Sequence, residues 1–278
     1  METMENRNFK TGLKIGVAGL GLIGGSILKA LYETGDYELV GISKSSHKKA
    51  AEFCTYSSPV LEDLAACNVV FVCSRMSETL DVLDKLEDIV RPDTIVTDVS
   101  SLKRFVNNKK RPYNFIGGHP MAGTEFSGFE NSFAELFSGT KWILNKKNEI
   151  LEDLIKKMGA KPIIMEENTH DARACLISHL PMLLSCTLLN TAIKEDNEAL
   201  KIASSGFRDT TRLALTDISL ALDMLELNKD NFNDLVDKFI KNLKELKNMP
   251  KTEFINTLNS IQKIRKSMYD DSGKNKLL

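Results

Sequence analysis

The stretch KIGVAGLGLIGGSILKA, residues 14–30, decides the fold of this chain. Its first part, residues 15–19, consists of small and β-branched residues, which is typical of a strand buried on both faces of a parallel sheet. The turn that follows has the spacing G-x-G-x-x-G, and a helix with apolar periodicity comes next. A strand, a glycine turn and a helix in this order predict a binding site for a dinucleotide.

Each glycine of the turn has a physical reason to be there. Gly19 makes the tight turn, Gly21 lets the backbone approach a pyrophosphate, and Gly24 lets the helix pack closely on its strand. The N-terminus of the helix adds free N–H groups and a partial positive charge. The residues expected to contact the cofactor here are Gly19, Leu20, Gly21, Leu22, Ile23 and Gly24. The alternative is a glycine-rich turn that only packs tightly.

The composition is that of a globular protein with two domains. The chain has 278 residues, of which 42% are hydrophobic and 27% charged, and this length exceeds one ordinary core. Because 37 basic residues nearly cancel 38 acidic ones, we expect no nucleic-acid partner. The five cysteines suit the reducing cytoplasm, and with the four histidines they show no metal-site spacing. The polar N-terminus does not resemble a signal peptide, so we expect a cytoplasmic protein.

Strand and helix signals alternate in the first half of the chain. After the glycine turn they fall, in order, at residues 38–42 (strand), 46–54 (helix), 68–73 (strand), 78–90 (helix) and 94–99 (strand). This alternation predicts an α/β Rossmann-type doubly wound, mostly parallel sheet with helices on both faces. Short apolar runs at residues 115–116, 142–144 and 162–165 would extend this sheet.

Near Glu166 the strand signals stop, and the residues beyond it have helical periodicity. We predict a Rossmann domain with the catalytic loop over residues 1–166, and an all-α domain for substrate binding and dimerisation over residues 167–278. Residues 174–193 form a run of 20 without a formal charge, which is long enough to cross a bilayer. Because the run also contains polar residues, we expect a central helix of a soluble domain or of a homodimer, and no membrane partner.

Ligands of an open parallel sheet bind beyond the carboxyl ends of its strands, and three polar stretches fall there. Cys73 and Ser74 follow the third predicted strand, TDVSS ends the fourth, and GGHPMAGTE follows the next. His119 in the last stretch stands on a turn made rigid by glycine and proline. Histidine is the side chain best suited to accept a proton near neutral pH. The alternative is a loop histidine that only hydrogen-bonds the backbone.

Five motifs, GLGLIGGS, TDVSSLK, GGHPMAGTEFSG, SHLPM and SSGFRDTTRLA, resemble in this order the prephenate/arogenate dehydrogenase family of tyrosine biosynthesis. The resemblance covers about residues 14–220. It implies oxidative decarboxylation of a cyclohexadienol: hydride passes from the hydroxyl-bearing ring carbon to the nicotinamide, the ring carboxylate leaves as carbon dioxide, and the ring becomes aromatic. The substrate would be prephenate, with arogenate as the alternative.

The resemblance also implies roles for single residues. His119, in the GGHP motif, would accept the hydroxyl proton, and Ser101 would hydrogen-bond the same centre. Arg212 would bind a substrate carboxylate, and Arg208 stands at a position that is basic in relatives. The other pocket residues would be Ser178, His179 and Glu125. A satisfied core histidine and a solvated loop carboxylate are the alternatives for the last two.

Two positions depart from the family pattern. Met182 stands where some prephenate-using relatives have a second histidine, which leaves the choice between prephenate and arogenate open. The carboxylate that binds the ribose hydroxyls of NAD is absent after the second strand, where Ser43, Lys44 and Ser45 stand. We therefore expect NADP to be preferred, with NAD as the alternative. Other function classes are a hydroxyacid dehydrogenase or imine reductase, and a redox sensor that binds NADPH without turnover.

Overall fold

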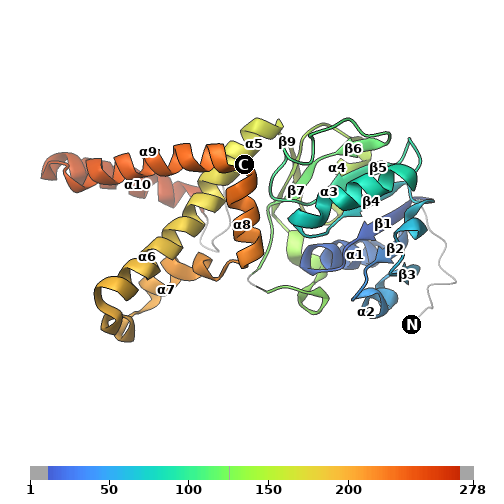
Figure 1. The fold of residues 1–278 in the computed structure, drawn as a ribbon, viewed down its shortest axis with the longest axis horizontal. Helices are drawn as coiled ribbons and strands as arrows, with labels where there is room; N and C mark the ends of the chain where they lie inside the picture. Colours follow the sequence, from blue (N-terminus) through green and yellow to red (C-terminus); the bar gives the residue numbers. More distant parts are fainter. Residues whose placement is uncertain (1–11, 125, 270–278) are drawn as a thin grey trace. The chain divides into compact units, whose positions relative to one another are not determined.

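The computed structural model describes residues 12–124 and 126–269. The chain forms two compact units, one up to Lys229 and one from Asp230. The first unit contains both β-sheets and the helices as far as Leu227 (Figure 1). The second unit is helical over its described residues, 230–268.

The larger sheet of the first unit has six strands in the order β3-β2-β1-β4-β5-β6, all parallel (Figure 1). The strands are β1 (Lys14–Ala18), β2 (Glu38–Ile42), β3 (Tyr56–Ser58), β4 (Val69–Val72), β5 (Ile95–Asp98) and β6 (Asn114–Ile116). The chain runs outward from β1 to β3 and then crosses to β4 on the other side of β1. Ligands of such sheets bind beyond the carboxyl ends at this reversal. The predicted Rossmann-type sheet is therefore confirmed.

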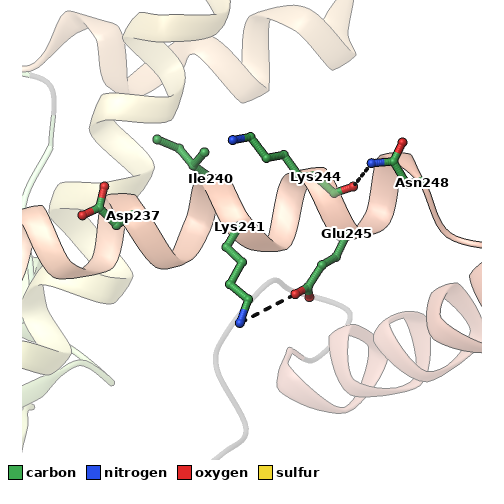
Figure 2. Close-up of a pocket in the computed structure, with 6 residues that line it drawn as sticks. All are labelled: Asp237, Ile240, Lys241, Lys244, Glu245 and Asn248. Carbon is green, nitrogen blue, oxygen red and sulfur yellow. Dashed lines mark hydrogen bonds and ion pairs between the residues drawn. The ribbon is translucent and has the colours of Figure 1, made fainter.

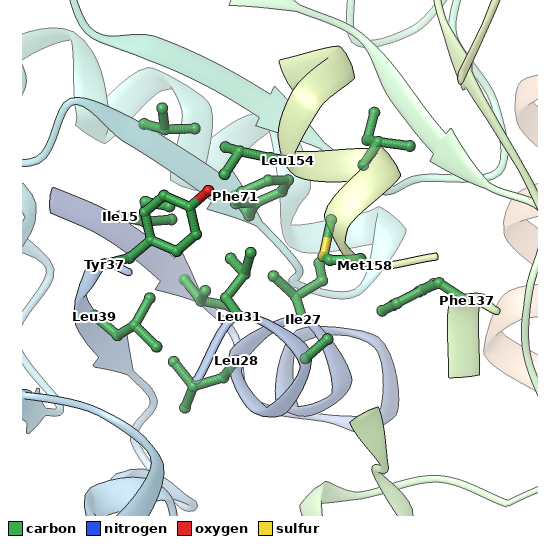
Figure 3. Close-up of a cluster of buried hydrophobic side chains, with 14 of the residues drawn as sticks. Ile15, Ile27, Leu28, Leu31, Tyr37, Leu39, Phe71, Phe137, Leu154 and Met158 are labelled. Atoms are coloured by element: carbon green, nitrogen blue, oxygen red, sulfur yellow. The ribbon is translucent and has the colours of Figure 1, made fainter. Parts of the chain in front are cut away.

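Alternate residues of the central strands pack on opposite faces of this sheet. Val69 and Phe71 of β4 belong to one apolar cluster, whereas Val70 and Val72 belong to the other. Figure 3 shows the first cluster, in which Ile27, Leu28 and Leu31 of the helix after β1 pack toward the sheet. Helices of this half of the chain are α1 (Leu22–Thr34), α2 (His47–Ala50), α3 (Met76–Lys85) and α4 (Glu149–Lys157). Burial on both faces explains why these strands are continuous apolar runs.

The apolar runs at residues 142–144 and 162–165 do not extend the large sheet, so this prediction is wrong. They form a second sheet, in which β7 (Gly118–Pro120) is antiparallel to β8 (Lys141–Leu144) and β8 is parallel to β9 (Lys161–Ile164). The chain changes sheets at Gly118, whose N–H donates to Oδ1 of Asp98 at 3.0 Å. A Cβ on Gly118 would lie 2.7 Å from the carbonyl oxygen of Asp98, so a larger residue would not fit.

Beyond β9 the described chain is helical, as predicted. One continuous run contains α5 (Glu167–Ala174), a π-helical turn at Cys175–His179 and α6 (Leu180–Asp196). By length and composition alone, the run from Glu167 to Ile202 could cross a bilayer. Within its most apolar stretch of 18 residues, 22% is buried in the fold. Two short helical segments pack on α6, namely α7 (Ser205–Thr211) and the turn Arg212–Leu215, and α8 (Ile218–Leu227) packs on α3.

The second unit is built from α9 (Lys229–Lys247) and α10 (Lys251–Met268). The N–H of Asn248 donates to the carbonyl of Lys244, and Pro250 precedes the first residue of α10. Apolar residues recur at helical spacing along α9, from Phe232 to Leu246, but α9 has no buried residue in the described chain. This stripe therefore does not form a core within a single chain.

Candidate active site

The glycine turn between β1 and α1 leaves space on one side and none on the other. Gly19 has a φ of +97°, and a Cβ there would lie 2.6 Å from the carbonyl oxygen of Cys73. A Cβ on Gly24 would lie 1.9 Å from the carbonyl oxygen of Gly19. Gly21, in contrast, has no atom within 4 Å of the place of its absent Cβ. The open side, at the N-terminus of α1, therefore fits the pyrophosphate of a dinucleotide.

The turn after β2 contains hydroxyl and ammonium groups and no carboxylate. Ser43 Oγ accepts a backbone N–H within the turn at 3.1 Å. Lys44 and Ser45 are exposed, whereas Lys49 forms an ion pair with Glu130. Of Ser43, Lys44 and Ser45, Lys44 carries the positive charge, and its exposed ammonium group can reach a phosphate.

The residues that follow β4 and β5 lie at the carboxyl edge of the sheet. Cys73 donates its N–H to Ala18 at the end of β1, at 2.6 Å, and the hydroxyl of Ser74 lies 3.3 Å from that of Thr79. Ser101 donates its hydroxyl to the sulfur of Met76 at 3.4 Å. The structure thus brings Cys73 and Ser74 to the glycine turn, but gives no contact between Ser101 and the GGHP histidine in the described chain.

His119 lies in the middle of β7, opposite Ile143 of β8, on a strand where the sequence predicted a turn. The Nδ1 atom of its partly buried ring is 2.9 Å from Nε2 of His170 on α5. Its Nε2 bonds to no described residue and is not among the buried polar atoms that lack a partner, so it is open to a ligand. Burial, and after it the neighbouring His170 ring and the charge of Lys103, lower the pKa of His119 well below 6.5, so the ring is neutral and can accept a proton.

Asp98 and Lys103 form an ion pair that is fully buried, with 0% exposure of both side chains. Lys103 Nζ lies 2.7 Å and 2.6 Å from the two carboxylate oxygens of Asp98, and 2.5 Å from the carbonyl oxygen of Gly118. Burial lowers the pKa of Lys103, and the charge of Asp98 opposes this effect. Because Asp98 also accepts the N–H of Gly118, the pair holds the residue just before His119 by both of its backbone polar groups.

Asp171 joins α5 to the segment that follows β5. Its carboxylate accepts the backbone N–H of Lys103 at 2.7 Å, the backbone N–H of Arg104 at 3.0 Å, and Nδ1 of His170 at 2.8 Å. Burial raises the pKa of Asp171, but these hydrogen bonds outweigh burial and leave the pKa below its usual value. Lys103, His170 and Asp171 were not among the site residues expected from the sequence, although Lys103 ends the motif TDVSSLK and the His-Asp pair stands near a helix start, where a capping role fits as well as a catalytic one.

Ser178 and His179 end the π-helical turn, and such turns are frequent at functional sites. His179 is 0% exposed, and neither of its ring nitrogens hydrogen-bonds to a described residue. Burial lowers the pKa of His179 to about 4. Met182 on α6 is also buried. His179 is therefore a neutral imidazole whose two ring nitrogens have no hydrogen-bond partner among the described residues.

The arginines expected to bind substrate stand on a separate segment. Arg212 begins the turn after α7 and is exposed, and Arg208 of α7 forms an ion pair with the aspartate that follows it, at 2.9 Å. Neither arginine contacts His119 in the described part of the chain. Glu125 lies outside the described residues.

A shallow hollow lies along α9 (Figure 2). It is lined by Asp237, Ile240, Lys241, Lys244, Glu245 and Asn248. Lys241 and Glu245 lie 3.9 Å apart, and the side-chain amide of Asn248 donates to the carbonyl of Lys244 at 2.9 Å. These are surface contacts within one helical segment and include none of the candidate site residues, so we assign no ligand to this hollow.

Two family models together match most of the chain. Residues 28–164 match the nucleotide-binding domain of prephenate dehydrogenase, and residues 166–264 match the dimerization domain of prephenate dehydrogenase. Prephenate dehydrogenase of Bacillus subtilis (strain 168) is 30% identical over an alignment of 257 residues, and the alignment covers 83% of this chain and 68% of that protein.

Two solved structures have a similar fold over nearly the whole chain. Arogenate dehydrogenase of Synechocystis is 29% identical with a TM-score of 0.79, covering 91% of this chain and 99% of that chain. Prephenate dehydrogenase of Aquifex aeolicus, in complex with hydroxyphenyl propionate and NAD+, is 26% identical with a TM-score of 0.82, covering 92% of this chain and 98% of that chain.

Proposed function

The chain belongs to the prephenate dehydrogenase family, and we propose that it oxidises and decarboxylates prephenate to 4-hydroxyphenylpyruvate. Arogenate, whose dehydrogenase is among the similar structures, is the alternative substrate. The observation that best supports the proposal is His119, a neutral imidazole with Nε2 open to a ligand.

In this proposal, a nicotinamide cofactor held at the glycine turn would supply the acceptor for the hydride on the ring carbon that bears the substrate hydroxyl. His119 Nε2 accepts the hydroxyl proton as the hydride leaves, so the oxygen becomes a carbonyl. The bond to the ring carboxylate then breaks, and its electron pair makes the ring aromatic as carbon dioxide departs. His119 returns the proton to the phenolate oxygen, which leaves the imidazole neutral for the next turnover. Arg212 would hold a substrate carboxylate through its planar guanidinium.

The cofactor in this proposal is NADP, with NAD as the alternative because a similar structure contains NAD+. Ser43, Lys44 and Ser45 would meet the 2′-phosphate, and no carboxylate stands there to repel it. Lys44→Ala should therefore reduce the preference for NADP, whereas Lys48→Ala, also exposed, is the matched control. Ser43→Asp combined with Lys44→Ala should reverse the preference. A higher kcat/KM with NAD in the unmodified protein would contradict the assignment.

One steady-state assay tests the proposed function. The protein is incubated with prephenate or arogenate, each with NADP or NAD, and formation of the reduced cofactor is followed by absorbance. We expect the highest kcat/KM with prephenate and NADP. Binding of a cofactor without oxidation of either substrate would refute the proposal and favour a redox sensor.

We further propose a cytoplasmic homodimer, in which residues 167–278 form the substrate-binding and dimerisation domain. The match to a dimerization domain supports this assignment. So do the exposed fractions of three helix residues, which are 52% for Leu176, 62% for Ile177 and 56% for Leu243. In a homodimer, a second copy of the chain would cover these apolar side chains, so no membrane is needed to bury them. Sedimentation should give a single species of twice the 31.1 kDa chain mass, and a monomer would contradict the proposal.

A further inference from the structure

Three side chains lie in a row that leads from a buried carboxylate to the proposed base. Oδ1 of Asp171 is 2.8 Å from Nδ1 of His170, and Nε2 of His170 is 2.9 Å from Nδ1 of His119. His170 is 2% exposed and Asp171 is 0% exposed. The two imidazole rings meet edge to face, with an interplanar angle of 78°. The inner members of the row are therefore held by the fold and shielded from water.

The carboxylate end determines the direction of hydrogen-bond donation along this row. The carboxylate of Asp171 already accepts two backbone N–H groups, and an ionised carboxylate can only accept. Nδ1 of His170 must therefore carry a hydrogen. When His170 is uncharged, this hydrogen is its single N–H, so its Nε2 accepts, and Nδ1 of His119 donates to it. The lone pair of His119 is then on Nε2, the atom open to a ligand.

We propose that His170, oriented by Asp171, is a positioning residue that selects the tautomer of His119 in which Nε2 is the proton acceptor. This inference deepens the proposed function, and the catalytic role of the tautomer rests on that function. The tautomer itself is a property of the unliganded protein. If His119 carried its hydrogen on Nε2, that atom could not accept a proton from a substrate hydroxyl.

Nuclear magnetic resonance can identify the tautomer directly, without any turnover. The chain has four histidines, so labelling the imidazole nitrogens with ¹⁵N gives four ring systems, and the variants His119→Asn and His170→Gln assign two of them. At neutral pH, without ligands, we expect the hydrogen on Nδ1 in both His119 and His170. A His119 that carries its hydrogen on Nε2 overturns the proposal, whether or not the protein turns over prephenate.

A pair of variants tests the consequence for catalysis. Glutamine and methionine are similar in length, but only the amide oxygen of His170→Gln can accept the N–H of His119. His170→Met should lower kcat by roughly 10- to 100-fold, the effect typical of losing a group that orients a functional imidazole. The substrate KM and the cofactor dissociation constant should stay close to wild type in both variants. The kcat of His170→Gln should remain much closer to wild type than that of His170→Met.

The outcomes separate this inference from the proposed function. Equal losses of kcat in His170→Gln and His170→Met, or a loss of cofactor binding in both, would indicate a packing role for His170 and overturn the proposal. If the wild-type protein oxidises neither substrate, the proposed function fails. The tautomer of His119 is still decided by the nitrogen spectra in that case.

Discussion

Replacing Gly24 by alanine tests whether close packing of α1 on the glycine turn shapes the cofactor site. The added Cβ would lie 1.9 Å from the carbonyl oxygen of Gly19 and 3.0 Å from Cys73 Cβ. Real Cβ atoms essentially never approach closer than 3.0 Å, so α1 would have to move by about 1.1 Å, or the turn would have to deform. The obstructing oxygen belongs to the backbone and cannot rotate away.

The magnitude follows from two opposing effects. Overpacking a close-packed site typically destabilises by about 1–3 kcal/mol. Alanine is a better helix former than glycine by about 1 kcal/mol, which offsets part of this loss. Because the obstructing atom is backbone, the upper end of the overpacking range applies, and we expect Gly24→Ala to lower the free energy of unfolding by roughly 2 kcal/mol. Cofactor affinity should fall as well, because the N-terminus of α1 would move with the helix.

Gly21→Ala is the matched control, because its Cβ would meet no atom within 4 Å. Its free energy of unfolding should stay within about 0.5 kcal/mol of wild type. The methyl group would occupy the open side of the turn, so cofactor affinity should fall. Urea unfolding and titration with NADPH measure the two quantities. A Gly24→Ala protein as stable as wild type would refute the packing argument, and unchanged affinity in Gly21→Ala would refute the placement of the pyrophosphate.

Four further outcomes are expected. His119→Asn should lower kcat about 10²–10⁴-fold because it removes the proton acceptor, while a cofactor titration stays at the wild-type dissociation constant. Arg212→Ala should raise the substrate KM roughly ten- to a hundred-fold through loss of a charged hydrogen bond, and an equal loss of cofactor affinity would contradict this role. Lys103→Met should lower the free energy of unfolding in urea by about 3–5 kcal/mol, because Asp98 would remain charged and buried. Acidification from pH 7 to pH 5 should lower the free energy of unfolding by about 2 kcal/mol through His179. The pKa of His179 is about 4 in the folded state and 6.5 in the unfolded state, so the unfolded state binds the proton first. Stability therefore falls as the pH drops below 6.5. His179→Leu should lose less stability over this range in the same urea measurement.

The parallel sheet was predictable because its central strands are apolar on both faces and alternate with helices. The strands β1, β2, β4 and β5 begin and end within one residue of the positions expected from the sequence. The edge strand β3 was missed because its residues, Tyr-Ser-Ser, have no apolar run. For β8 and β9 the apolar signal was correct, but the sheet that they join depends on the exit of the chain at Gly118, a tertiary feature.

The candidate site was predictable only where its residues are close in sequence. The glycines of the first turn have a local spacing that indicates their geometry, and the GGHP motif indicated His119. The contact of His119 with His170 joins residues 51 positions apart and depends on how α5 packs. A His-Asp pair at the start of a helix also fits a capping role, so its sequence does not indicate that Asp171 orients an imidazole.

The location of His119 on a paired strand affects how the protein loses activity on heating. β7 pairs with β8, whose residues Trp142 and Leu144 belong to the main apolar core of the first unit. Separation of β7 from β8 therefore requires this core to open with it. Backbone amides in β7 should exchange with deuterium only as fast as the whole unit unfolds, and no folded state with a displaced base should accumulate below the melting temperature.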